Sequence, residues 1–367
     1  MGFSRRLLNL IVNNRIPGTR SLRCIDLARQ QFFFNTTTLP QSPNGKGFES
    51  EEGPEGSATS WEPVAIAGYR KHKQAAGEAL KMERIWLPSP SFTIRSSASS
   101  NRWTIECIPV AGDKVFCTDH SGHAILFDAN MRQVDVMPIL QRPKWRPISI
   151  FIPSDDAAAD NHDDVEGSLF VMESAPDPEL RCSGQLSNQF EAFVCRRKPK
   201  TPSTNPWHHL LLPPPPFVVC DTKKYRRPPK ISSYAVVGGG SGSSSQICIS
   251  TEGAGAYSLD TVRHTWSRLG ESALPFHGKV EYVPELELWF GISIKDWALA
   301  AADLSAMDYS QTPLVSVGME FDPPEEWQVF RHPQLVHLGS GRFCVVRFFC
   351  TMMLGSYIAG PAMPSWD

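Results

Sequence analysis

Three stretches of this 367-residue chain contain residues of the kinds found in metal or phosphate sites. Residues 154–167, SDDAAADNHDDVEG, offer enough carboxylates for a Ca²⁺ ion but lack the spacing and distal glutamate of a calcium-binding loop. His208 and His209 resemble half a metal site, yet neighbours on a strand point to opposite faces. The glycines in residues 238–242 are not followed by the Lys-Ser/Thr of a phosphate loop. We therefore expect no catalytic, metal or cofactor site in these stretches.

The composition limits the class of protein. A formal net charge of −2 provides no long-range field to attract nucleic acids or anionic membranes. No window approaches the roughly 18–20 apolar residues of a membrane-crossing helix. The nine cysteines include no C-x-x-C pair, and several lie within apolar runs, which is typical of buried free thiols in a reducing compartment. These features predict a soluble protein of the cytoplasm or nucleus, with no nucleic-acid or membrane partner.

The elements that would position any site are predicted to be strands. The 31 prolines and 26 glycines interrupt nearly every window that could keep a helical period. Runs of four to eight residues rich in Val, Ile, Phe, Leu and Tyr recur between Gly, Pro, Asp and Ser. This pattern predicts an all-β fold.

One arrangement of residues recurs along the chain. The segment YSLDTVRHTWSRLG (257–270) has an apolar strand that ends in Asp260, a polar turn, and a second strand that carries Trp266. The segment ILFDANMRQVDVMPIL (125–140) repeats the plan with Asp128. Further positions that match are Asp26, Trp207 and Asp303. Because they recur, we interpret these residues as repeat positions whose aspartates bind turn amides, and not as catalytic residues.

The repeated unit has four strands. KVFCTDHSGHAILFD (114–128) and QICISTEGAGAYSLD (246–260) each read as two strands around a tight glycine turn, and each follows a further strand. Units of about 40–50 residues with four strands, an aspartate turn and a tryptophan are typical of kelch-type β-propellers. We predict five to six blades, the last of them incomplete or completed by the N-terminus.

The propeller is expected to form a single domain over residues 1–350. A Pro/Gly/Ser-rich insertion at 35–82 is predicted to be mostly disordered, and 351–367 an irregular tail. Long loops on a rigid scaffold are either a binding surface or tolerated spacers, and the sequence leaves both alternatives open.

The N-terminus has two interpretations. Five arginines and no acid precede Asp26, as in a transit peptide for mitochondria or plastids. Alternatively, strands at 7–14 and 21–27 joined by the turn RIPG form a hairpin of the folded domain. The turn residues favour the hairpin.

A family resemblance agrees with the repeat. LLNLIVNNRIPGTRSLRCIDLARQQFFF, GAYSLDTVRHTWSRLG, LPFHGKVEYVPELELWFGIS, AAADLSAMD and LVHLGSGRFCVVRFF resemble a grass-expanded plant family, domain of unknown function 1668, described as kelch-like. The resemblance covers most of residues 5–350. It implies a kelch-like fold and a plant origin, and it brings no catalytic residues.

Two functions fit a kelch-like propeller. The first is a non-enzymatic scaffold or adaptor that binds a protein partner through one face, with an exposed apolar patch on a rim. The second is an enzyme that uses a central pocket, such as a copper-dependent oxidase, for which His208, Cys220 and Tyr225 are candidates by residue type. The sequence favours the first function and identifies no partner.

Overall fold

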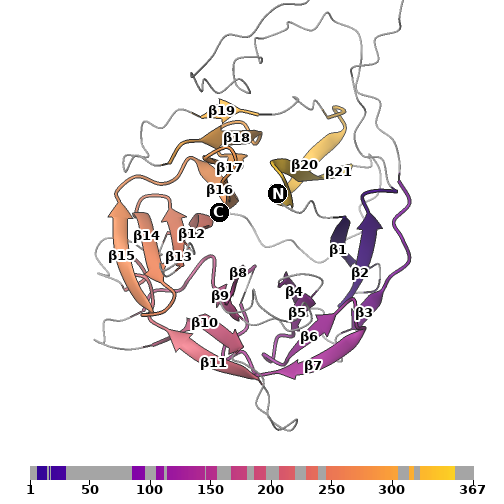
Figure 1. Cartoon of the computed structure of the whole chain (residues 1–367), viewed down its shortest axis with the longest axis horizontal. Helices are drawn as coiled ribbons and strands as arrows, with labels where there is room; N and C mark the ends of the chain where they lie inside the picture. Colours follow the sequence, from indigo (N-terminus) through magenta and orange to yellow (C-terminus); the bar gives the residue numbers. More distant parts are fainter. Residues whose placement is uncertain are drawn as a thin grey trace, which may run out of the picture. The chain divides into compact units, whose positions relative to one another are not determined.

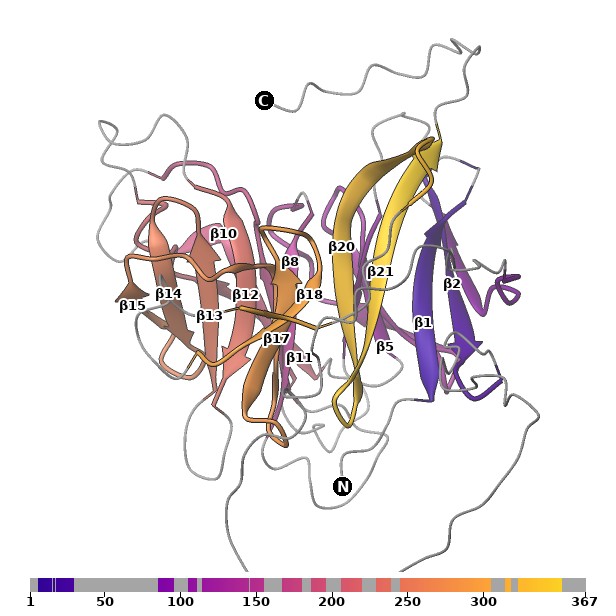
Figure 2. The same cartoon turned by 90° about the horizontal axis from the view of Figure 1, so that it is seen from above.

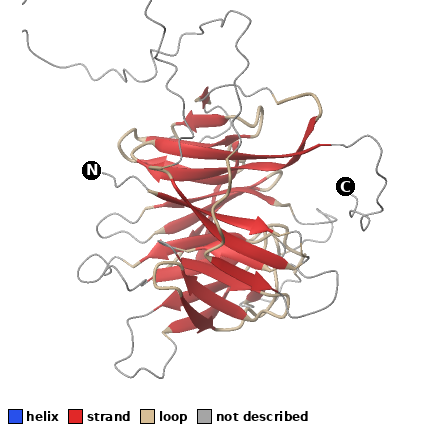
Figure 3. Cartoon of the chain, turned by 90° about the vertical axis from the view of Figure 1, so that its right-hand side faces the viewer, coloured by secondary structure: helices blue, strands red, loops and turns tan. Residues whose placement is uncertain are grey.

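The computed structural model describes most of the chain outside residues 30–84. The described residues are 6–14, 16, 18–29, 85–95, 105–110, 114–144, 146–154, 167–179, 186–195, 206–219, 229–238, 245–304, 314–317 and 323–351. All of their regular secondary structure is β-strand, as Figure 3 shows. The expectation of an all-β fold is therefore confirmed.

The chain divides into two units. One unit is Met1–Leu27 together with Leu87–Asp367, and the other is Ala28–Trp86. The strands labelled in Figure 1 all belong to the first unit. The predicted insertion at 35–82 lies outside the described residues, and so does the predicted tail except for Thr351, which ends the last strand.

The first sheet contains the expected N-terminal hairpin. Strands β1 (Leu7–Asn13) and β2 (Thr19–Asp26) pair antiparallel, and β3 (Phe92–Arg95) adds to the other side of β2. Residues 7–13 are thus paired backbone in the folded structure, because each contributes to the ladder with β2.

The next two sheets are four-stranded antiparallel meanders in which neighbours in sequence are neighbours in space. The second sheet contains β4 (Glu106–Pro109), β5 (Lys114–Thr118), β6 (Ala124–Asp128) and β7 (Gln133–Met137). The third contains β8 (Ile148–Pro153), β9 (Gly167–Met172), β10 (Ser187–Cys195) and β11 (Trp207–Leu212). These are the four-strand units that the recurring pattern predicted.

Two further meanders are joined into one eight-stranded sheet. The first contains β12 (Ile231–Val237), β13 (Gln246–Thr251), β14 (Gly255–Asp260) and β15 (Thr265–Gly270). The second contains β16 (Phe276–Val283), β17 (Leu288–Ser293), β18 (Leu299–Ala302) and β19 (Val315–Ser316). Parallel pairing of β12 with β16 joins them, which differs from the separate units expected from the sequence. The pairing gives hydrogen-bond partners to backbone groups on the edges of β12 and β16, which are the first strands of their meanders.

The last described sheet is a long two-stranded hairpin. It consists of β20 (Trp327–Gly339) and β21 (Arg342–Thr351), shown in yellow in Figure 2. The two strands meet around Gly339 and Gly341, where the sequence predicted the turn. Their register shifts at three places, so the ladder is interrupted by bulges.

Aromatic side chains join successive sheets. The middle strands β9, β13 and β14 are buried along almost their whole length, as expected for strands covered on both faces. The ring pairs between sheets are Phe92–Phe127 at 4.0 Å, Phe116–Phe193 at 5.2 Å, Phe217–Tyr257 at 5.4 Å and Phe290–Phe343 at 4.8 Å between centroids. Each sheet therefore contributes to an apolar core that it shares with the next.

Glycine is required at the turn between β5 and β6. Gly122 has a φ of 84°, in the left-handed region that residues with a Cβ rarely adopt. A Cβ there would also lie 2.1 Å from the carbonyl oxygen of Leu140. The predicted strand–glycine–strand hairpin thus depends on both the conformation and the small size of this residue.

Gly291 offers a direct test of core packing. A Cβ at this position would lie 2.5 Å from Cδ1 of Phe276, which is fully buried. We expect Gly291→Ala to lower the free energy of unfolding by about 1–3 kcal/mol, because an added methyl group overpacks the core. Urea unfolding measures the change.

The control for this variant is Val262→Ala, since Val262 is 73% exposed. It should shift stability by no more than about 0.5 kcal/mol. Equal unfolding midpoints for Gly291→Ala and the wild type would contradict the packing of Phe276 against β17.

Candidate functional site

The recurring aspartates bind turn amides in two sheets. Asp128 ends β6, and its Oδ1 accepts hydrogen bonds from the amides of Asn130 and Met131, both at 2.9 Å. Asp260 ends β14, and its Oδ1 accepts from Val262 and Arg263 at 2.9 and 2.8 Å. The two turns therefore share one set of side-chain to backbone contacts.

The other repeat positions have different surroundings. Asp26 ends β2 and forms an ion pair with Arg6 at 2.9 Å. Trp207 begins β11 and is buried, whereas Trp266 in β15 is half-buried and donates from Nε1 to the carbonyl of Pro213 at 2.8 Å. Asp303 is exposed and follows β18. The six residues lie on several different sheets.

The histidine pair behaves as strand geometry requires. His208 is exposed on β11, while His209 is half-buried and its Nε2 lies 2.5 Å from Oε2 of Glu191 on β10. The two side chains do not meet at one ion. Within the described residues, no three His, Cys, Asp or Glu side chains are grouped closely enough to hold a metal.

Several other candidate positions lie outside the described residues. They are residues 155–166 of the acidic loop, glycines 239, 240 and 242, Cys220 and Tyr225. Among the described cysteines, Cys117 and Cys248 are buried as expected, Cys350 is exposed, and the others are half-buried: Cys24, Cys107, Cys195 and Cys344. The expectation of buried thiols is wrong for Cys350, because β21 belongs to a two-stranded sheet and leaves this end of the strand open to solvent.

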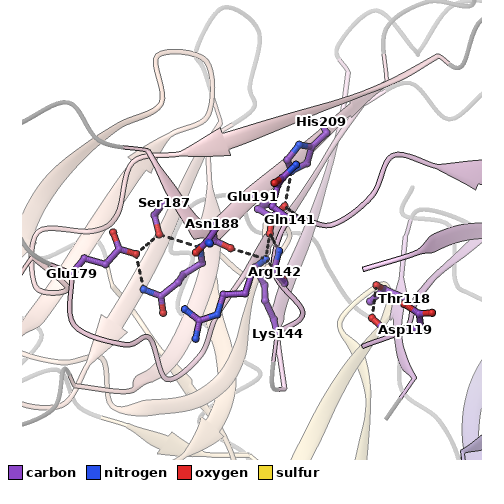
Figure 4. A network of polar contacts seen from close by, with 11 residues as sticks. Thr118, Asp119, Gln141, Arg142, Lys144, Glu179, Ser187, Asn188, Glu191 and His209 are labelled. Atoms are coloured by element: carbon purple, nitrogen blue, oxygen red, sulfur yellow. Dashed lines mark hydrogen bonds and ion pairs between the residues drawn. The ribbon is translucent and has the colours of Figure 1, made fainter. Parts of the chain in front are cut away.

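A buried polar network surrounds Glu191, and Figure 4 shows its members. We call Glu191, Lys144, His209 and the amides of Gln141 and Arg142 the Glu191 network. One carboxylate oxygen accepts from Gln141 N at 2.8 Å, and the other accepts from Arg142 N at 3.2 Å and forms an ion pair with Lys144. Lys144 Nζ also donates to the carbonyl of Arg142 at 3.0 Å. The network thus links strand β10 of the third sheet to the loop that follows β7.

Burial and hydrogen bonding oppose each other in this network. Burial acts to raise the pKa of Glu191, but hydrogen bonds from His209 and Lys144 and the charge of Lys144 hold it below its usual range. Burial lowers the pKa of Lys144, and Glu191 partly offsets that effect. Because each charge has its partner and further hydrogen bonds, we interpret the network as a structural fastening.

A second cluster gathers charged and aromatic side chains from different sheets. We call Arg20, Glu106, Arg146, His277, Trp297, Arg331 and His332 the Arg-His cluster. Arg20 on β2 lies 3.6 Å from the carboxylate of Glu106 on β4. Burial raises the pKa of Glu106, while the charges of Arg20, Arg331 and Arg146 act in the opposite direction. Three guanidinium groups thus influence a single carboxylate.

The aromatic half of the cluster is stacked. The rings of Trp297 and His332 lie 4.4 Å apart between centroids with an interplanar angle of 19°, and His277 lies 4.4 Å from His332. Burial lowers the pKa of His277 to about 4, with a further contribution from His332. Burial and the charge of Arg146 likewise lower the pKa of His332. At neutral pH the arginines therefore carry the positive charge of the cluster.

Backbone strain accompanies this cluster. Arg146 has a φ of 51° and Trp297 a φ of 56°, which is uncommon for bulky residues. Arg347 holds the Trp297 turn by donating to its carbonyl at 3.4 Å. Strained residues concentrate at binding and catalytic sites, so the Arg-His cluster is the candidate site of the described residues.

The sequence alone did not reveal this cluster. Its members come from separate sheets, and no two of them except Arg331 and His332 are adjacent in the chain. The available signal was a charged residue or histidine in or near the first strand of successive units, as with Glu106 in β4 and His277 in β16. Chemically, a group of guanidinium side chains beside neutral rings suits a carboxylate or another planar anion.

These features define an all-β protein built from successive antiparallel meanders. The chain belongs to the family described as "Protein of unknown function (DUF1668)", whose model matches residues 5–361. No curated protein is similar enough in sequence to count as a match. In the described part there is no helix of the length and apolar character needed to cross a membrane.

Solved structures show distant similarity. One is the β-propeller domain of Myceliophteria thermophila Cps50 (Swd1), with 12% identity over 53% of this chain and 52% of that chain and a TM-score of 0.32. An auxiliary nutrient binding protein from Bacteroides ovatus has 12% identity over 61% and 45%, with a TM-score of 0.34. Its counterpart from Bacteroides thetaiotaomicron has 9% identity over 65% and 50%, with a TM-score of 0.31. The matches span about half of each of these chains.

The aspartate turns can be tested separately from the cluster. Asp260→Ala removes the acceptor of two turn amides, so we expect the free energy of unfolding to fall by about 0.5–2 kcal/mol. Asp260→Asn keeps an acceptor oxygen and should cost less. Chemical denaturation compares the two variants, and equal losses would contradict the role of the hydrogen bonds.

The Glu191 network makes a stronger prediction. Glu191→Gln removes the carboxylate that is paired with the buried Lys144, and we expect a loss of about 3–5 kcal/mol in the free energy of unfolding. Adding Lys144→Met should restore part of it. The control, Glu271→Gln, alters a side chain that is 88% exposed and should change stability by at most about 1 kcal/mol.

The pH dependence of stability follows from the lowered pKa of Glu191. Its contribution is fully present above the unfolded pKa of roughly 4.3 and is lost as the pH falls through the lower folded value. Thermal melts of the wild type and Glu191→Gln should therefore converge in acid. A constant difference down to low pH would contradict this assignment.

Proposed function

We propose that the chain is a kelch-like β-propeller of plant origin, and that it acts as a non-enzymatic scaffold that binds an acidic segment of a protein partner. The repeated four-strand meanders support the propeller, since each unit has the strand order of a blade. We assign five to six blades, as the sequence pattern predicts. Cytoplasmic or nuclear localisation stays a prediction.

The observation that carries the binding role is the Arg-His cluster. Arg20, Arg146 and Arg331 all act on the carboxylate of Glu106, so three guanidinium groups gather around this one position. A guanidinium group offers several N–H donors in a fixed plane, which fits the carboxylates of aspartate and glutamate side chains. The neighbouring Trp297 and His332 add flat surfaces against which the apolar parts of a peptide can pack.

Exposed apolar side chains form an additional surface on the second sheet. Val134 and Val136 on β7 are 48% and 74% exposed, and Met131 in the preceding turn is also exposed. Val134 and Val136 occupy alternate positions of β7, so their side chains point to the same face of the sheet. Such a surface is consistent with the rim patch expected of a protein-binding propeller.

The test uses a fluorescein-labelled hexaglutamate peptide and the full-length protein. We expect the peptide to bind, with an affinity that falls as salt rises, because salt screens the arginine charges. Arg331→Gln and Arg146→Gln should each weaken binding up to about fivefold, as an exposed charge pair contributes roughly 0.2–1 kcal/mol. Fluorescence anisotropy measures both effects.

The matched control is Arg268→Gln, since Arg268 lies on β15 and is half-exposed. This variant should bind the peptide as the wild type does. Equal weakening by all three substitutions would indicate a nonspecific charge effect and contradict the site.

A stoichiometric transition metal in the purified protein, measured on the same sample, would overturn the non-enzymatic proposal in favour of a copper-dependent enzyme.

A further inference from the structure

Two cysteines lie opposite each other on neighbouring strands of the second sheet. Cys107 on β4 and Cys117 on β5 are direct partners in the antiparallel register, and their Sγ atoms lie 3.5 Å apart. Directly opposed residues in such a ladder have Cα atoms about 4.5–5.5 Å apart, which is within the range of disulfide-bonded residues. A bond of about 2.05 Å therefore requires the sulfurs to approach by roughly 1.5 Å. No strand has to change register.

The surroundings restrict which molecules reach this pair. Cys117 is 2% exposed, and Cys107 is half-buried. A cavity of about 10 Å³ is lined by both cysteines, by Arg20 and by apolar side chains of the first sheet. Its volume is that of about one water molecule. This space is too small for a bulky disulfide reagent, so only small molecules reach the pair without displacing the neighbouring side chains.

The two thiols differ in acidity. The hydrogen bond from Cys117 lowers the pKa of Cys107, burial opposes this effect, and the charge of Arg20 lowers the pKa further. The same contact and burial raise the pKa of Cys117. Cys107 is thus the member of the pair that loses its proton more readily, and the thiolate is the reactive form of cysteine.

We propose that Cys107 and Cys117 form an oxidisable pair that reacts with hydrogen peroxide to give a reversible disulfide. The Cys107 thiolate attacks one peroxide oxygen, the O–O bond breaks, and hydroxide leaves with a sulfenic acid remaining on Cys107. The Cys117 thiol then attacks that sulfur, the S–O bond breaks, and water is released after proton transfer. Two electrons pass from the two thiols to the peroxide, and a dithiol reductant restores the pair.

The reaction changes the charge next to the Arg-His cluster. Arg20 forms an ion pair with Glu106, the residue that precedes Cys107, and its charge also acts on Cys107. The disulfide is neutral, so oxidation removes the thiolate charge from the surroundings of Arg20. This inference stands on the geometry of the cysteine pair and does not depend on what the cluster binds.

The first measurement maps the bond in the full-length wild-type protein. The protein is treated with hydrogen peroxide, the remaining thiols are alkylated, and a tryptic digest is analysed by mass spectrometry. We expect residues 103–114 and 115–132 to appear as a linked pair that a dithiol reductant separates. Oxidised glutathione should give the linked pair far more slowly. Oxidation of the exposed Cys350 without the linked pair would overturn the proposal.

Variants then separate the two roles. In Cys117→Ser we expect the sulfenic acid on Cys107 to persist and to be trapped by dimedone. Cys107→Ser should give neither a dimedone adduct on Cys117 nor a disulfide of Cys117. Cys248→Ser changes a buried cysteine of another sheet and should keep the linked pair. Arg20→Gln should slow the reaction by roughly threefold for each unit by which the pKa of Cys107 rises, because the smaller thiolate fraction is partly offset by the greater nucleophilicity of a more basic thiolate. Equal trapping of both cysteines in the single variants would contradict the assignment of Cys107 as the attacking thiol.

Discussion

The rest of the structure depends on the burial of both faces of successive antiparallel sheets. A single meander buries little surface, and its middle strands are apolar on both sides, so each sheet is stable only against another. Strands β9, β13 and β14 are buried almost throughout, and ring pairs such as Phe116–Phe193 join one sheet to the next. This packing brings together side chains from different sheets, among them those of the Glu191 network and the Arg-His cluster.

The buried carboxylate of Glu191 is the charged group of this core whose bonds are best defined. Glu191 lies between two sheets, and its carboxylate is satisfied by Lys144, His209 and two backbone amides. Such a network orients a connection more strictly than apolar packing does, because hydrogen bonds are directional and unpaired charges are costly in the interior. The network fixes the connection shortly before Arg146, a residue of the Arg-His cluster.

The cluster and the cysteine pair are neighbours through Arg20. Its guanidinium forms an ion pair with Glu106, and its charge influences the acidity of Cys107. The proposed binding of an acidic segment and the proposed oxidation therefore share one cation, although their tests are independent. A change in either group alters the electrostatic surroundings of the other, since both interact with the same charge.

The sequence by itself determined the strands, the turns and the opposite orientation of His208 and His209. These are local properties: apolar runs between glycines and prolines, an aspartate that binds the next amides, and the period of two in a strand. The N-terminal hairpin was also predictable, because its turn residues lie beside the two strands that they connect.

Only the tertiary structure decided what meets between sheets. The parallel pairing of β12 with β16 depends on the edges left open by two separate meanders, which no local pattern encodes. The Arg-His cluster joins residues as distant as Arg20 and Arg331. Cys107 and Cys117 were visible as strand residues, but their opposition required the register of β4 and β5. Sequence spacing fixes which face of a strand a residue occupies, whereas sheet packing fixes what lies against that face.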